Sequence, residues 1–113
     1  MEILVRKSQD VTIVELTGDM DGNSAPEAQT QVLQLAEQET KDTKIVLDMT
    51  KVPYMSSAGL RMLLVVYRTV KSRGGNIVLV GLSEELRDTM ALTGFLDFFE
   101  HYDTADQGIA ALT

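Results

Sequence analysis

Two adjacent serines, Ser56 and Ser57, stand at the start of a predicted helix and are the side chains best placed for chemistry. Their hydroxyls lie beside the backbone N–H groups that a first helical turn leaves unpaired. The structural interpretation is that one serine is the N-cap, while Ala58 and Gly59 permit close packing. The functional interpretation is a phosphorylation site, because these N–H groups and the helix dipole stabilise an attached phosphate. Spacing alone favours the N-cap.

Asp19 and Asp21 flank Met20 after a predicted strand and form a second candidate site. Such a D-x-D pair can ligate a divalent cation, but two carboxylates supply too few oxygens for a complete metal site. No EF-hand continuation follows them. Turn formation by the aspartates is therefore the favoured interpretation, and no metal is expected.

The rest of the sequence gives little support to an enzyme. It contains no cysteine, a single histidine (His101), no GxSxG motif and no GxxxxGK[ST] motif. These features exclude thiolate metal sites and cysteine nucleophiles, and they argue against a serine hydrolase and a P-loop nucleotide site. An enzyme built on Ser57 or on the two aspartates would lack a neighbouring base and a complete ligand set. We therefore expect no enzyme and no cofactor.

The charge balance limits the partners. Lys and Arg number 10 against 17 Asp and Glu, which gives a formal net charge of −7 over 113 residues. Nucleic-acid binding depends on basic residues that neutralise phosphates, so no nucleic-acid partner is expected. The longest apolar run, Met62–Tyr67, is far shorter than the ~20 residues of a membrane-spanning helix. No membrane insertion and a cytoplasmic location are therefore expected.

Hydrophobic periodicity predicts an alternation of strands and helices. Alternating, β-branched residues predict a strand over 11–17, with residues 3–7 as its hairpin partner. Apolar runs predict further buried strands, and apolar residues at helical spacing predict helices. The other predicted strands are Lys44–Met49, Asn76–Gly81 and Phe95–Tyr102; the predicted helices begin near Pro26, cover Leu60–Val70, follow the N-cap Ser83 and span Thr104–Leu112.

These elements predict one α/β domain over residues 1–113, a mixed and mostly parallel sheet of four to five strands with about four helices packed on it. The helix over 60–70 joins two buried strands into a βαβ unit, whose strands should be parallel. The segment 57–73 carries basic residues and no acidic residue. Its apolar residues cover more than one helical stripe, so either a neighbouring helix or a protein partner must cover the surplus.

Four segments of the chain carry a family resemblance. They are LTGDMD at 16–21, IVLD at 45–48, VPYMSSAGL at 52–60 and GGN at 74–76. With these segments the chain resembles, over nearly its whole length, the stand-alone STAS domains of the sulfate-transporter and anti-sigma-factor-antagonist family. In the antagonist branch the central motif is D-S-[SAT]-G-L. Ser57 corresponds to its serine with Ala58, Gly59 and Leu60 in register, whereas Ser56 replaces its aspartate.

The resemblance implies that Ser57 is the phosphorylated residue, with Ser56 as the second choice. It also implies that the loop after the second strand borders this site. Asp19, Asp21 and Asn23 are therefore expected beside the serines.

Arg61 follows Ser57 at the i+4 spacing of one helical face. Helical side chains lean toward the N-terminus, so its guanidinium could reach back to a phosphate on Ser57. The alternative is a solvated arginine on a basic helix surface. The resemblance does not decide between them, because relatives often carry glycine at this position.

The resemblance further implies a partner switch. The unphosphorylated antagonist binds an anti-sigma factor that is also a serine-protein kinase, and phosphorylation by that kinase releases it. A metal-dependent serine phosphatase restores the binding form, so ATP and metal ions belong to the partners. The alternative is a STAS scaffold or regulatory subunit that binds without phosphorylation, for example in a lipid-transport ATPase complex.

Overall fold

Strands and helices alternate along the chain, as the hydrophobic periodicity predicts. The computed structural model describes residues 1–38 and 42–113. The strands in this part of the chain are β1 (Glu2–Ser8), β2 (Val11–Thr17), β3 (Lys44–Lys51), β4 (Asn76–Val80) and β5 (Glu100–Tyr102). The helices are α1 (Ala25–Gln38), α2 (Ser57–Ser72), α3 (Glu84–Leu92) and α4 (Ala105–Leu112), with a 3-10 turn η1 (Leu96–Phe98). The predicted α/β class is confirmed.

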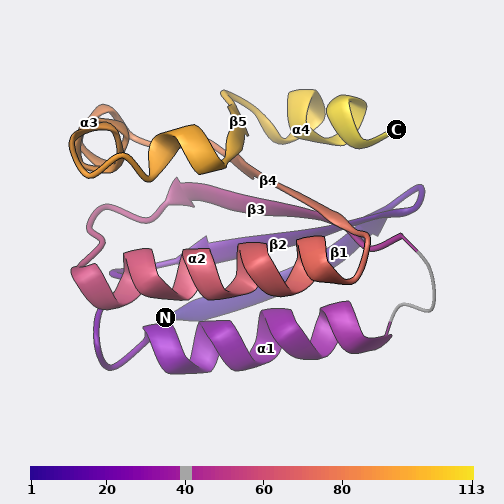
Figure 1. The fold of residues 1–113 in the computed structure, drawn as a ribbon, viewed down its shortest axis with the longest axis horizontal. Coiled ribbons are helices and arrows are strands. Elements are labelled where there is room, and N and C mark those ends of the chain that lie inside the picture. The colour runs from indigo at the N-terminus through magenta and orange to yellow at the C-terminus, as the bar shows by residue number, and fades with distance from the viewer. Residues whose placement is uncertain (39–41) are drawn as a thin grey trace.

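The strands form one mixed sheet, whose order in space is their order along the chain. β1 and β2 form an antiparallel hairpin, and each later strand runs parallel to the one before it. Parallel neighbours need crossover connections, which α1, α2 and α3 provide. Figure 1 shows the resulting layers, with α1 and α2 on one side of the sheet and α4 on the other.

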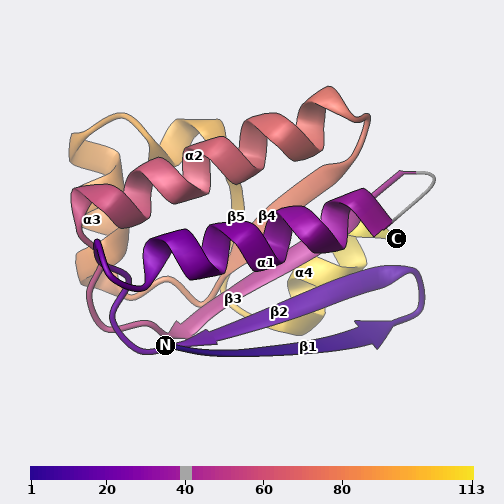
Figure 2. The ribbon, with the colours of Figure 1, turned by 90° about the horizontal axis from the view of Figure 1, so that it is seen from below.

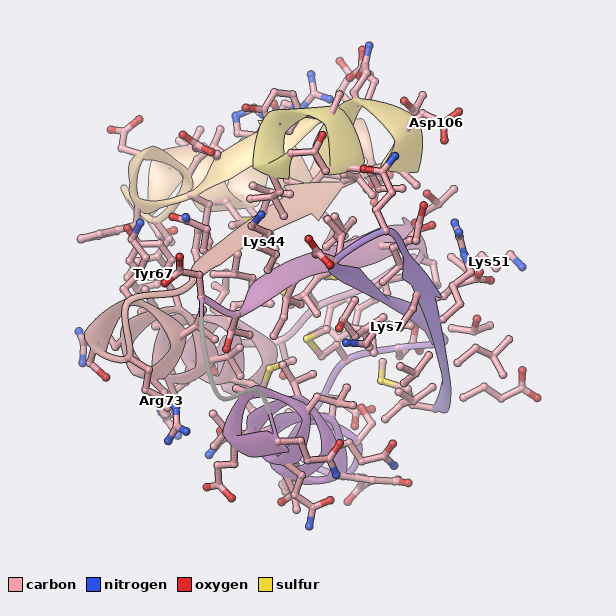
Figure 3. The ribbon with its side chains drawn as sticks, turned by 90° about the vertical axis from the view of Figure 1, so that its right-hand side faces the viewer. Lys7, Lys44, Lys51, Tyr67, Arg73 and Asp106 are labelled. Atoms are coloured by element: carbon pink, nitrogen blue, oxygen red, sulfur yellow. The ribbon has the colours of Figure 1, made fainter. Side chains whose placement is uncertain are left out.

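The sheet separates two apolar clusters. Val14 and Leu16 of β2 belong to the larger cluster under α1 and α2, whereas Val11 and Ile13 belong to the smaller one under α4. Alternate residues of a strand face opposite sides of a sheet, so β2 is buried on both sides. Figure 3 views this arrangement from one end, with α4 on one side and α1 and α2 on the other.

A neighbouring helix covers most of the surplus apolar surface of α2. Val32 of α1 and Val66 of α2 lie in the same cluster, and the two helices run side by side in Figure 2. Tyr67 packs its ring edge-on against Phe99, with ring centroids 5.1 Å apart. Leu64 remains half-buried. Of the two alternatives left open by the sequence, a neighbouring helix or a protein partner, the neighbouring helix therefore accounts for most of this apolar surface.

Several predicted boundaries differ from the structure. The helix predicted over Leu60–Val70 begins earlier, at Ser57, and ends later, at Ser72. The strand predicted over 95–102 was wrong in its first part: Leu96–Phe98 form η1, and only Glu100–Tyr102 pair with β4. The consecutive residues Phe95 and Leu96 both pack against the larger cluster, whereas Phe98 is exposed. Consecutive residues of a strand would face opposite sides of the sheet, so a helical turn fits this segment better than a strand. His101 lies on β5, a strand at the edge of the sheet.

The other predictions of secondary structure agree with the observed elements. The hairpin turns at Gln9, which has a positive φ of 56°. Ser83 is the N-cap of α3, and its Oγ accepts a hydrogen bond from the backbone N–H of Leu86 at 3.1 Å. No helix in residues 1–38 and 42–113 is long and apolar enough to cross a membrane.

Candidate functional site

The segment that joins β3 to α2 lies against the loop that follows β2. The backbone N–H of Met20 donates to the carbonyl of Tyr54 at 2.9 Å, and the N–H of Ser56 donates to the carbonyl of Met20 at 2.9 Å. Met20 and Met55 thereby form an isolated parallel bridge. The structure thus brings the loop 19–23 to the start of α2, where the sequence resemblance placed it.

Gly59 makes this close approach possible. A Cβ at this position would lie 2.6 Å from Cγ of Met55, 2.9 Å from the carbonyl oxygen of Met20 and 3.0 Å from Cγ of Met20. Contacts this short are repulsive. The carbonyl oxygen of Met20 cannot easily move away, because it belongs to the backbone and accepts a hydrogen bond from the N–H of Ser56. Glycine is therefore required where the first turn of α2 meets the loop.

Asp21 fixes the conformation of that loop. Its Oδ1 accepts hydrogen bonds from the backbone N–H of Asn23 at 2.9 Å and of Ser24 at 3.1 Å. These backbone donors, first Asn23 and then Ser24, lower the pKa of the Asp21 carboxyl below its ordinary value. The Ser24 hydroxyl donates in turn to the carbonyl of Asp19 at 2.7 Å. The D-x-D pair therefore forms a turn, as favoured from the sequence.

Ser56 occupies the N-cap position of α2 without acting as a side-chain cap. Its backbone is extended (φ −83°, ψ 178°), as an N-cap requires. Its Oγ, however, has less than 1 Å² of exposed surface and makes no hydrogen bond within the described part of the chain. We expected one serine to be the N-cap, and the backbone of Ser56 does occupy that position. Its hydroxyl, however, faces inward and does not cap the helix.

Ser57 differs sharply from its neighbour. It is the first residue of α2 and is exposed, whereas Gly59 and Leu60 behind it are buried and Ala58 is half-buried. Its hydroxyl stands at the positive end of a 16-residue helix. Of the two serines, only Ser57 is an exposed residue, whereas the hydroxyl of Ser56 is buried.

Arg61 lies one turn further along α2, exposed between two shallow grooves. The groove that it shares with Ser57 has a volume of about 310 Å³ and separates α2 from the segment after α3. Its lining residues are Ser57, Leu60, Arg61, Leu64, Thr93 and Phe95. The other groove, of about 300 Å³, lies between α2 and the start of α1.

The grooves also include residues that the sequence analysis missed. Leu64 had a sequence signal, as part of the apolar surplus of α2. Thr93 and Phe95 had none, because they follow α3 in the chain and meet α2 only through the fold. Met20 was noted only as the residue between two aspartates, although its backbone holds the loop against α2.

The site offers a serine hydroxyl beside an apolar groove. The groove beside Ser57 contains neither a carboxylate nor an imidazole that could activate the hydroxyl. No group of three or more His, Cys, Asp or Glu side chains that could hold a metal ion occurs among residues 1–38 and 42–113. The arrangement defines an α/β domain that presents a serine and an apolar groove at one end of a helix.

Residues 2–108 match the model of the STAS domain family, and the chain therefore belongs to that family. It is 31% identical to the anti-sigma-B factor antagonist of Bacillus subtilis over 105 residues, which cover 93% of this chain and 94% of that protein. This relative and a similar protein of Listeria monocytogenes are anti-sigma-B factor antagonists, which are regulatory proteins and not enzymes. This agrees with the prediction that the chain is not an enzyme.

Solved structures share the fold. An anti-sigma factor antagonist from Mycobacterium paratuberculosis superposes with a TM-score of 0.83 at 25% identity, covering 98% of this chain and 92% of that one. SpoIIAA, a cell fate determinant of Bacillus, gives a TM-score of 0.74 in both its unphosphorylated and its phosphorylated form. The unphosphorylated form is 15% identical, and the match covers 97% of this chain and 96% of that one. The phosphorylated form is 16% identical, and the match covers 99% of this chain and 100% of that one.

The contact at Gly59 predicts the outcome of an alanine substitution. Gly59→Ala should destabilise the protein by about 2 kcal/mol. Three contacts at or below 3.0 Å put the overpacking near the upper end of the usual ~1–3 kcal/mol, and the better helix propensity of alanine returns ~1 kcal/mol. Urea unfolding measures this difference. Gly22→Ala, in the loop that faces this turn, is the control, since a Cβ there meets nothing within 4 Å. A Gly59→Ala protein as stable as wild type would contradict the packing argument.

The lowered pKa of Asp21 predicts a pH-dependent contribution to stability. Its folded pKa lies below the unfolded value, so the unfolded state binds more protons and the contribution is lost as the pH falls. Asp21→Asn should be less stable than wild type at neutral pH, and the two proteins should converge below about pH 4. Unfolding at a series of pH values measures this, with the exposed Asp88→Asn as the control for removing one charge. A difference that stays constant down to pH 2 would refute the account.

Proposed function

We propose that the chain is an anti-sigma factor antagonist whose binding is controlled by phosphorylation of Ser57. The unphosphorylated form binds an anti-sigma factor that is also a serine-protein kinase, and the phosphorylated form is released. A metal-dependent serine phosphatase returns the chain to its binding form. The exchange takes place in the cytoplasm, and the whole chain, residues 1–113, acts as one domain. The proposal draws on membership of the STAS family and on the names of the relatives.

The observation that carries the proposal is the difference between the two serines. A kinase must bring the hydroxyl oxygen of its substrate in line with the γ-phosphate of ATP. The exposed Ser57 at the first position of α2 permits this without unfolding. The hydroxyl of Ser56, with less than 1 Å² exposed, does not. Accessibility therefore supports Ser57, the residue in register with the family serine, over Ser56.

The charge of a phosphate explains how such a site would switch binding. In the transfer, the Ser57 oxygen bonds to the γ-phosphorus, ADP leaves and the hydroxyl proton passes to a base on the kinase. The product carries −1.5 to −2 charges at neutral pH. At a helix N-terminus this charge is favourable by ~0.3–1 kcal/mol, whereas leaving it buried and unpaired in an interface costs several kcal/mol. Since ~1.4 kcal/mol changes affinity tenfold, binding falls by orders of magnitude while the fold persists.

SpoIIAA supports this separation of fold from binding. Its phosphorylated and unphosphorylated structures resemble the present fold equally well, with a TM-score of 0.74 each. A STAS fold can therefore carry a phosphate without rearranging its strands and helices. The neighbouring groove, with Leu64 and Phe95, gives a partner an apolar surface that a charge on Ser57 would adjoin.

The phosphorylation site can be mapped by mass spectrometry. Wild type incubated with ATP and the kinase captured from the source cell should gain one phosphate, on the peptide that contains Ser57. Ser57→Ala should gain none. Ser56→Ala is the matched control and should be phosphorylated like wild type, because it removes only a buried hydroxyl without a hydrogen-bond partner in the described structure.

Two results would count against the proposal. Phosphate on Ser56 alone would overturn the accessibility argument and the family register together. A chain that stays unmodified while it remains bound to its partner would favour the alternative of a STAS scaffold or regulatory subunit, for example of a lipid-transport ATPase. The replacement of the family aspartate by Ser56 is the feature that favours this alternative. Ser56→Asp, which restores the aspartate, tests whether that residue limits recognition by the kinase.

Arg61 is expected to stabilise the dianionic phosphate. It shares a groove with Ser57 and lies at i+4 on the same helix, where a guanidinium can form charge-assisted hydrogen bonds to phosphate. A nearby cation lowers the second pKa of phosphoserine, which is ordinarily about 6. Arg61→Ala should therefore raise this pKa, as measured by a phosphorus NMR titration of protein with phosphoserine encoded at position 57.

Arg68→Ala is the control for this titration, because it removes an equal charge from an exposed position further along α2. It should leave the titration close to that of wild type. Identical curves for Arg61→Ala and wild type would show that Arg61 is only a solvated member of the basic helix surface.

A further inference from the structure

β1 gives the sheet a long open edge. It pairs along all of its residues with β2, from Glu2 opposite Thr17 to Ser8 opposite Val11, without a register shift. In the described sheet it is the last strand on its side, and no other strand pairs with its outer edge. Figure 2 shows β1 along one margin of the molecule, whereas α1 lies in front of β3. The opposite edge, β5, has only three residues.

This edge lacks most of the features that keep sheet edges apart. Natural edge strands are protected by proline, by bulges, by short length or by charges. β1 has seven residues, and neither a proline nor a bulge interrupts it. Two consecutive apolar residues are exposed on it, Leu4 by 59% and Val5 by 45%. Consecutive residues face opposite sides of a sheet, so apolar surface is exposed on both sides of the edge.

The charges of β1 are arranged to complement a second copy of the same strand. When two antiparallel copies pair around a two-fold axis at Leu4, Glu2 of each copy lies opposite Arg6 of the other. The same register places Leu4 opposite Leu4 on that side of the sheet and Ile3 opposite Val5 on the other side. An axis at Val5 would instead place Leu4 opposite Arg6. Only the first of these registers matches opposite charges and apolar residues at once.

We propose that β1 is a self-association surface, through which two copies of this chain form a symmetric dimer with one continuous ten-stranded sheet. Backbone hydrogen bonds along the two edges supply the pairing, as in other cases of strand addition. The Leu4 contact and the two Glu2–Arg6 pairs fix its register. The occupant of this edge is thus a second copy of the chain, and the proposal is independent of Ser57 and of the proposed partner switch.

Sedimentation velocity of the purified protein tests the dimer directly. The measurement covers about 5 to 500 µM, to include a micromolar dissociation constant. It is made at about 0.15 M salt, where the Debye length of ~8 Å screens the repulsion between two chains of net charge −7. Wild type should shift from monomer to dimer across this range. A monomer at every concentration would overturn the proposal.

Charge reversal tests the register. Because the interface is isologous, Glu2→Arg turns both opposite-charge pairs into like-charge pairs, and so does Arg6→Glu. Each variant should dimerise at least about tenfold more weakly. The double variant Glu2→Arg/Arg6→Glu restores both pairs and should recover the wild-type constant to within about threefold. Failure of the double variant to recover, with the variants shown to be folded by circular dichroism, would overturn this register.

An exposed leucine elsewhere provides the control. Leu92, at the end of α3, is 88% exposed and lies outside β1. Leu92→Lys should leave the dimer intact, whereas Leu4→Lys should abolish it. A dimer lost with Leu92→Lys but kept with Leu4→Lys would place the interface on another surface and refute the proposal.

Discussion

The contact between the carbonyl of Met20 and the first turn of α2 is the constraint on which the candidate site depends. It exists because Gly59 has no Cβ, and it is held by two backbone hydrogen bonds that join Met20 to Tyr54 and Ser56. The loop after β2 is therefore fixed to the start of α2, and Asp21 fixes the loop internally. The same contact places the two serines differently, with the hydroxyl of Ser56 inward and Ser57 exposed.

This arrangement suits control by charge better than control by shape. The position of Ser57 at the N-terminus of α2 is one where the fold tolerates a negative charge, while a partner surface that must desolvate it does not. Residues of α2, including Arg61, line the groove beside Ser57. A charge added to Ser57 therefore alters the surface that this groove offers to a partner. The rest of the fold supports this helix: α2 packs against α1 beside it and against the sheet, and it makes an edge-on ring contact through Tyr67.

The sequence predicted the features that depend on local patterns. The alternation at Val11–Thr17, the N-cap Ser83 and the apolar runs of β3 and β4 locate elements whose signals lie within a few residues. The proximity of the loop 19–23 to the serines came from the family resemblance, because it depends on contacts between distant segments. The inward hydroxyl of Ser56 and the start of α2 at Ser57 could not be predicted, since either serine can cap a helix and packing decides which one does.

The central claim is that the charge on Ser57 controls partner binding without a change of fold. The most direct measurement is affinity capture from the source cell with three forms of the chain: wild type, Ser57→Ala, and protein with phosphoserine encoded at position 57, each with its amide NMR spectrum recorded. The account predicts that wild type and Ser57→Ala capture the same kinase-fold ATPase, that the phosphorylated form does not, and that spectral changes stay near the start of α2. Equal capture by all three forms, or a spectrum altered throughout the sheet, would contradict it.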